Sequence, residues 1–362
     1  MKIGIISPSN PSKGLFRDAE CLVWALEKGS KDEVEVFYAD NLRKIERTEL
    51  SSNHQGSPPK NNHITFEKWV NGLDVVVMLE VINPIVLNLE NERTRVVYIP
   101  NLEWAIIDSA NPDVDEWIAY LKSLQDRITV IAKTKKISGV LTKNKISNSL
   151  IEWSIPDKII TPRFSISRML RNLFSKKKTV LMNAGMGGWK SRRGVDIMIQ
   201  AIRKISQNCD YHFILKTIKP WEDYELGEKP EKLELIEGFL DRSEMNSLVE
   251  SVDIVVYPSR FEGFGLSLLE TLHRGTPVMC TNGWPMNELQ TIDDERLKIR
   301  STKESSLRLA TSYEPSSNSI VSNLEHLSNK NLNRIFSQKK VIAGLKERQE
   351  LFVLQICSLF GE

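Results

Sequence analysis

The sequence predicts an α/β protein built from two series of parallel strands joined by helical crossovers. Short apolar runs that are typical of buried strands alternate with segments of helical periodicity, first over about 2–134 and again from about 179 onward. The chain has 362 residues, which is long enough for two domains that each bury a core. We expect one domain over 1–160, a second over 161–340, and a final segment, 341–362, that crosses back to the first.

The N-terminal half begins with a predicted strand at 2–7 and a helix from about 18 to 27. Further apolar runs predict strands at 33–39, 74–80, 95–100 and 128–134. The segment 50–62 is rich in Ser, Asn, Gly and Pro, and it predicts a surface loop.

The C-terminal half repeats this alternation, with strands predicted at 179–185, 211–217, 233–238, 253–259 and 276–282. Helices are expected at 195–205, at 241–252 with Ser243 as N-cap, and at 265–275 with Gly275 closing it. A last helix over 340–360 carries one apolar stripe, formed by Val341, Leu345, Phe352, Ile356 and Leu359 or Phe360.

Composition narrows the class of protein. The formal net charge is only +2, so the total charge gives no argument for a nucleic-acid or membrane partner. No apolar run approaches the roughly 20 residues of a membrane span, and the N-terminus lacks a secretory apolar region. The four cysteines are far apart in sequence, which favours free thiols. We expect a cytoplasmic protein, and a peripheral place at a membrane or in a phage-infected host cell is the alternative.

The segment 257–289 holds the most informative motif. A buried strand ends in a loop that contains Glu262 and Gly265, and a helix follows at once. Ligands of open α/β sheets bind at the carboxyl ends of strands, and glycine at a helix start lets backbone N–H groups approach an anion. Glu262 and Glu270 are suited to bind hydroxyl groups beside such an anion site. Hydroxyls next to a diphosphate describe a nucleotide sugar.

The segment 257–289 resembles the E-x7-E region of family-4 glycosyltransferases, with Glu262 and Glu270 as its two acids. The resemblance implies the GT-B fold, in which two Rossmann-like domains face each other across a cleft and a C-terminal helix returns to the N-terminal domain. It also implies a retaining transfer from a nucleotide-sugar donor with no cofactor and no metal. A UDP-sugar is favoured, and a GDP- or ADP-sugar is possible.

The resemblance assigns roles to residues of the second half. Glu270 is expected to hold the ribose and Glu262 the hydroxyls of the donor sugar. Diphosphate ligands are expected in Arg193 and in the loop that carries Phe264 and the N–H groups of Gly265 and Leu266.

Two further segments resemble the family. Residues 183–202 match its first glycine turn imperfectly, because Met186 stands where an arginine is usual, and Lys190 or Arg192 is expected to supply that cation. Phe239 and Leu240 lie in the segment that meets the base in the family.

The N-terminal half matches less closely. No histidine follows the strand at 95–100, where many members of the family carry one. Glu103 is our candidate for a catalytic carboxylate there, so the expected catalytic residues are Glu262, Arg193 and Glu103. An alternative for Glu103 is a capping residue next to a buried Trp104. Gly14, in the loop after the first strand, is expected near the diphosphate and the acceptor.

Other polar motifs are better explained by structure. Asp113-Val114-Asp115 has the D-x-D pattern of a metal site, but acids at that position favour a helix N-terminus. The five histidines show no ligand spacing, and His273 fits a capping role at the end of its helix.

The region 133–193 is strongly basic, and 158–195 contains ten basic residues and no acid. The basic residues could form a solvated surface of the protein. Alternatively, they could bind an anionic acceptor, either a nucleic acid or a lipid surface. A hydroxymethylated base of phage DNA would fit a nucleic-acid acceptor, whereas an ordinary polysaccharide or lipid-linked sugar acceptor requires no special charge. A sugar-nucleotide-binding or epimerase-like protein on the same fold is a further alternative. No stable protein partner is inferred.

Overall fold

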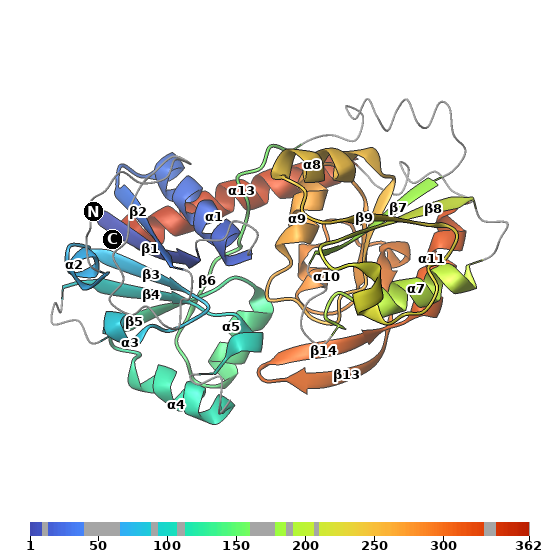
Figure 1. Cartoon of the computed structure of the whole chain (residues 1–362). Coiled ribbons are helices and arrows are strands. Elements are labelled where there is room, and N and C mark those ends of the chain that lie inside the picture. Colours follow the sequence, from blue (N-terminus) through green and yellow to red (C-terminus); the bar gives the residue numbers. More distant parts are fainter. Residues whose placement is uncertain are drawn as a thin grey trace. The chain divides into compact units, whose positions relative to one another are not determined.

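The computed structural model describes residues 1–8, 14–39, 66–87, 93–106, 113–159, 178–185, 191–205, 210–328 and 338–361. The chain divides into two compact units, each built around a β-sheet (Figure 1). Unit 1 consists of Met1–Pro156 and Arg348–Glu362, and unit 2 consists of Asp157–Glu347.

Unit 1 contains a six-stranded sheet in the order β2-β1-β3-β4-β5-β6, and all of its pairs are parallel. Its strands are β1 Lys2–Pro8, β2 Glu33–Ala39, β3 Val75–Leu79, β4 Arg95–Ile99, β5 Ile128–Ala132 and β6 Ser149–Leu150. Its helices are α1 Gly14–Gly29, α2 Phe66–Asn71, α3 Pro84–Leu87, η1 Leu102–Trp104, α4 Val114–Ser123 and α5 Lys135–Lys143. The first five strands are those expected from the sequence. The inner strands β3 and β4 are buried almost throughout, whereas the edge strand β2 alternates buried Val34 and Val36 with Glu33 and Glu35.

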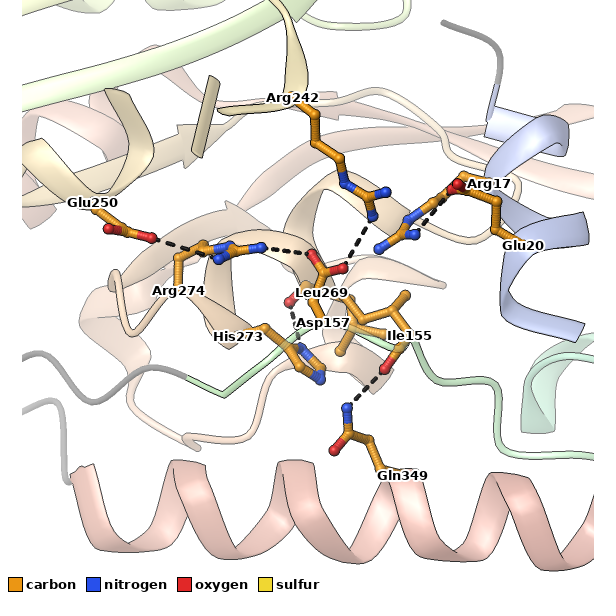
Figure 2. Close-up of polar contacts among 10 residues, drawn as sticks. All are labelled: Arg17, Glu20, Ile155, Asp157, Arg242, Glu250, Leu269, His273, Arg274 and Gln349. Carbon is orange, nitrogen blue, oxygen red and sulfur yellow. Dashed lines mark hydrogen bonds and ion pairs between the residues drawn. The ribbon is translucent and has the colours of Figure 1, made fainter. Parts of the chain in front are cut away.

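The C-terminal helix α13, Gln338–Gly361, contributes its second half to unit 1. Phe352 of this helix is fully buried against Trp24 and Trp153, with ring centroids 6.3 and 5.0 Å away. Arg348 Nε donates to the Trp153 carbonyl at 2.7 Å. Gln349 donates to the Ile155 carbonyl at the same distance, as Figure 2 shows. The return of the C-terminal helix to the N-terminal half is therefore confirmed.

Unit 2 contains a second six-stranded sheet, in the order β12-β11-β10-β7-β8-β9. Its strands are β7 Lys178–Gly185, β8 Tyr211–Thr217, β9 Leu233–Glu237, β10 Ile254–Tyr257, β11 Val278–Thr281 and β12 Lys298–Ile299. The helical elements are α7 Val195–Lys204, η4 Trp221–Tyr224, α8 Arg242–Ser251, α9 Leu266–His273, α10 Met286–Leu289, η5 Glu295–Leu297 and α11 Ser317–Ser328. An antiparallel hairpin, β13 Ser301–Leu307 with β14 Ala310–Pro315, adds a separate two-stranded sheet.

The two central strands of unit 2 position the candidate site. β7 pairs directly with β10, with Ile254 opposite Val180 and Val255 opposite Leu181. Parallel neighbours end at the same edge of a sheet, so the segments that follow β7 and β10 leave that edge side by side. The apolar face of α7 covers the strands, and Ile199 and Ile202 are buried there.

Helix ends in unit 2 confirm most sequence expectations and correct one. Gly275 adopts a left-handed φ of 68° after α9, as expected for a closing glycine. The N-cap of α8 is Asp241 and not Ser243: Asp241 accepts from the Glu244 N–H at 2.8 Å, and Glu244 in turn accepts from the Asp241 N–H at 2.8 Å. This reciprocal capping box satisfies two free N–H groups, whereas Ser243 lies inside the first turn.

Unit 2 begins at a buried carboxylate. Asp157 is 7% exposed in its side chain and accepts from Arg242 at 3.0 Å and from Arg274 at 3.1 Å. Figure 2 shows both guanidinium groups directed at this carboxylate, with Glu250 on the far side of Arg274. The same view shows His273 Nδ1 directed at the Leu269 carbonyl in the last turn of its own helix, at a distance of 2.9 Å. The C-cap of α9 is Arg274 and not His273, so the capping role expected of His273 was wrong.

Candidate functional site

The loop after β10 buries the first acid of the motif. Glu262 is 6% exposed, and the flanking Phe261 and Phe264 are each 4% exposed. The loop ends at Gly265, which is the N-cap of α9 and has a left-handed φ of 98°. Helix α9 therefore begins at Leu266 with free N–H groups at the carboxyl edge of the sheet, a position that favours anions.

The turn Ser191–Gly194 brings two cations to Glu262. Arg193 Nη1 donates to Glu262 Oε1 at 2.5 Å, and Arg192 Nη1 lies 3.8 Å from Glu262 Oε2. Burial by itself would raise the pKa of Glu262, but the guanidinium groups of Arg193 and Arg192 hold that pKa below its usual value. Glu262 is therefore ionised in a buried, cation-rich environment.

The second acid, Glu270, lies in α9 and affects the same buried tyrosine as Glu262. Burial raises the pKa of Tyr257, and the charges of Glu270 and Glu262 raise it further while Arg193 lowers it. The phenol donates to the Ser267 carbonyl at 3.0 Å. All three charged groups thus act on one hydroxyl at the edge of β10, although Tyr257 was not singled out from the sequence. Of the predicted site, the structure brings Arg193 and Glu262 into contact, and Glu270 acts electrostatically on the same tyrosine.

The residues expected at the base lie in the loop after β9. Phe239 is 67% exposed, which is unusual for so large an apolar side chain, and Leu240 beside it is partly buried. Gly238 precedes them with a φ of 89°, and the buried Lys216 donates to its carbonyl. Burial lowers the pKa of Lys216.

The predicted residues of unit 1 have a different setting. Glu103 is 3% exposed within η1, and Gly14 is the first residue of α1 and is exposed. Near Glu103 in sequence, Asn101 Nδ2 donates to Glu80 Oε2 at 2.7 Å. Glu80 has a φ of 62°, a strained value that residue type alone does not reveal and that sequence analysis missed.

Several basic residues of the region 133–193 are engaged within the protein. Lys133 is 2% exposed and pairs with Asp18 at 3.0 Å, so its assignment to an exposed basic face was wrong. Lys178 donates to the Leu327 carbonyl at 2.7 Å. Lys190 lies outside the described residues, as do Arg163, Arg168, Arg171, Lys176 and Lys177.

Asp113 of the D-x-D pattern is a helix cap. Its carboxylate accepts from the N–H groups of Asp115 and Glu116 at 2.8 and 3.2 Å, at the start of α4. Within the described ranges no group of three or more His, Cys, Asp and Glu side chains could hold a metal ion. A search of the same ranges found no helix with the length and apolar character needed to span a membrane.

The whole chain superimposes on a solved structure of WaaG, a glycosyltransferase involved in lipopolysaccharide biosynthesis. The TM-score is 0.62 at 15% identity, covering 100% of both chains. The fold is GT-B. A second GT-B match, Anabaena HepE in complex with UDP-glucose, has a TM-score of 0.62 at 13% identity and covers 100% of this chain and 99% of that one.

Residues 177–305 of this GT-B chain, all within unit 2, match the family described as Glycosyl transferases group 1. O-antigen chain mannosyltransferase B of Escherichia coli is 30% identical over 104 residues, 27% of each chain. Lipopolysaccharide glucosyltransferase WaaG of Escherichia coli is 25% identical over 132 residues, 35% of each chain. The matched segment thus spans about a quarter to a third of the length of these curated relatives.

Proposed function

We propose that the protein is a retaining glycosyltransferase that moves a sugar from a nucleotide-diphosphate donor, most simply a UDP-sugar, to a hydroxyl acceptor. The observation that carries the proposal is the contact of Arg193 with Glu262 beside the N-terminus of α9. This contact brings a cation that can bind phosphate, Arg193, and a carboxylate that can bind hydroxyls, Glu262, together at the end of β10. The match to group 1 glycosyl transferases and the names of the relatives support a transferase.

The donor would be held by groups of unit 2. The N–H groups of Gly265 and Leu266 would bind the diphosphate together with Arg193, while Glu270 would bind the ribose. The side chains of Arg192 and Lys190 would add positive charge, and Phe239 with Leu240 would meet the base. A UDP-sugar is favoured because a structural neighbour of the same fold is described in complex with UDP-glucose.

Catalysis would rest on charge stabilisation. When the bond from the sugar to the diphosphate breaks, negative charge grows on the leaving phosphate, and Arg193 with the N–H groups of α9 would stabilise it. Glu262 is held as a carboxylate by Arg193 and Arg192, so it can accept hydrogen bonds from hydroxyls of the donor sugar. The acceptor hydroxyl would attack the anomeric carbon from the side of the leaving group and give its proton to the departing phosphate oxygen, which retains the configuration. We propose that Glu103 contributes a carboxylate from unit 1.

A saccharide is the favoured acceptor class, because the named relatives act in O-antigen and lipopolysaccharide synthesis. Hydroxymethylated DNA stays an alternative, although Lys133 is withdrawn from the basic region by its buried pair with Asp18. A protein that only binds the nucleotide sugar is the third possibility, and transfer to any acceptor separates it from a transferase.

Donor identity can be tested by a thermal-shift panel of UDP-, GDP- and ADP-sugars, since a ligand of the native state raises the unfolding temperature. The stabilising donor is then incubated with oligosaccharide, lipid-linked saccharide and hydroxymethylated DNA, and the anomeric configuration of the product is read by NMR. Glu262→Gln should abolish transfer, whereas Glu304→Gln, on the exposed face of β13, should not. Transfer that survives Glu262→Gln, or an inverted product, contradicts the proposed mechanism.

A further inference from the structure

A single arginine joins the turn and the loop that form the candidate site. Arg260 lies in the loop after β10, two residues before Glu262, and its side chain is 14% exposed. Its backbone N–H donates to the Arg192 carbonyl at 2.7 Å, and its own carbonyl accepts from the Tyr313 N–H of β14 at 2.8 Å. The backbone of Arg260 thus connects the cation-bearing turn to the β13–β14 hairpin.

The guanidinium of Arg260 uses all five of its N–H groups. Nη1 and Nη2 donate to the two oxygens of Asp196 at 2.9 and 2.7 Å, and Nε and Nη2 donate to the two oxygens of Glu314 at 3.0 and 2.9 Å. The second hydrogen of Nη1 goes to the Ser191 carbonyl at 2.9 Å. Only the planar fork of arginine can bind two carboxylates in pairs and a carbonyl as well.

The turn held by Arg260 contains one conformationally strained residue. Ser191 has a left-handed φ of 54°, which is unusual for a residue other than glycine. Gly194 has a φ of 67°, which glycine adopts without strain, and its N–H donates to the Ser191 carbonyl at 2.9 Å. Strained residues keep such values only where the surroundings fix them. Since the carbonyls of Ser191 and Arg192 both accept from Arg260, the position of the turn depends on that residue.

Arg260 also neutralises two carboxylates beside the turn. Asp196 lies in the first turn of α7, and Glu314 lies on β14. Without Arg260 these two negative charges would compete for the guanidinium groups of Arg192 and Arg193 and would oppose an anionic ligand. With Arg260 in place, Arg193 remains directed at Glu262.

We propose that Arg260 is a positioning residue that fixes Arg192 and Arg193 for the diphosphate of the donor, with Glu314 of the β13–β14 hairpin as its outer support. The inference rests on the proposed function, which supplies the ligand. It predicts a defect confined to recognition of the phosphates, because neither the base-contacting loop after β9 nor Glu270 is held by Arg260.

The test measures the affinities of purified full-length variants for UDP and for uridine by calorimetry, with GDP and ADP and their nucleosides if UDP does not bind. Arg260→Met should weaken UDP binding by about tenfold or more, the value of one lost charge-assisted phosphate contact, and leave uridine binding unchanged within about twofold. Arg260→Lys should remain defective, because a point charge cannot replace the fork. Glu314→Gln should cause a smaller loss in the same direction. Arg296→Met is the matched control, because Arg296 pairs with Asp294 within its own 3-10 turn.

Equal losses for UDP and uridine would assign Arg260 a merely structural role and overturn the inference, as would full rescue by Arg260→Lys. If Arg260→Met does not fold, Glu314→Gln decides, because Glu314 is 42% exposed and its loss should leave the fold intact. Unchanged preference for UDP over uridine in Glu314→Gln would then overturn the inference. Wild-type protein that binds no nucleoside diphosphate would overturn the proposed function as well, so the two failures are distinguishable.

Discussion

Replacement of Gly194 by alanine tests how tightly the turn with Arg193 is packed. Gly194 is the N-cap of α7, with φ 67° and ψ 36°. A Cβ built on it would overlap the Pro258 carbonyl oxygen and lie 3.0 Å from the carbonyl carbon. Because both partners are backbone groups of the two site segments, no side-chain rotation can relieve the overlap.

The expected cost has two parts. A non-glycine residue in the left-handed region costs about 1–2 kcal/mol. The turn must also move by roughly 1 Å from Pro258, and forced shifts in a packed region typically cost about 1–3 kcal/mol more. Gly194→Ala should therefore lower the free energy of unfolding by about 2–5 kcal/mol.

Gly227→Ala supplies the control, because Gly227 has a φ of 70° and its Cβ would meet no atom closer than 4.0 Å. It should show only the conformational part, about 1–2 kcal/mol. Urea unfolding of both variants gives the difference, and calorimetry gives the affinity for UDP, which should fall only for Gly194→Ala. Equal destabilisation of the two variants, with unchanged UDP binding in both, would refute the reasoning.

Three further perturbations test other parts of the structure. Asp18→Leu should destabilise unit 1 by about 3–5 kcal/mol because it leaves the buried Lys133 without its carboxylate. The double variant with Lys133→Met should recover much of that loss in urea unfolding. If the effects of the two substitutions on the free energy of unfolding simply add, the coupling is contradicted. The contribution of the ionised Glu262 is the free energy of unfolding of the wild type minus that of Glu262→Gln. It should be fully present above the unfolded pKa of about 4.3 and should fall as the pH drops through the lowered folded pKa. A difference that does not change between pH 3 and 7 would argue against the ion pair with Arg193. Phe239→Ala should weaken uridine binding by about tenfold through lost stacking. The unfolding temperature should stay unchanged because the ring is exposed. An unchanged affinity for uridine would show that Phe239 is not part of the base site.

Local patterns were sufficient for β1 to β5, for β7 to β11 and for helices α1, α7, α8, α9 and α13, but not for the short strands β6 and β12 or for the β13–β14 hairpin. Runs such as 75–79 and 254–257 are apolar at every position, which suits strands buried on both faces of a parallel sheet. The start of α8 was misplaced because Asp241 and Ser243 are both good N-caps, and only the backbone geometry decides which one reaches the free N–H groups. Glu80 likewise carries no sequence signal, since its left-handed φ is imposed by neighbours in space: Tyr98 donates to its carbonyl at 2.9 Å.

Charge was the property least predictable from the sequence. Lys133 belongs to a basic segment when the chain is read in order, but the fold buries it against Asp18, 115 residues away. Arg260 carried no signal at all, because its two carboxylate partners lie 64 and 54 residues away. Electrostatic roles depend on distances in space, which residue type and local spacing do not contain.

The sequence by itself determined the α/β class and which residue types follow each strand, because side-chain periodicity and glycine conformation are local properties. The tertiary structure decided which of those residues meet. Arg193 and Glu262 are 69 residues apart and come into contact because β7 and β10 are neighbours in one parallel sheet, so the segments that follow them leave the same edge. That adjacency turns a glycine turn and an acidic loop into one charged site.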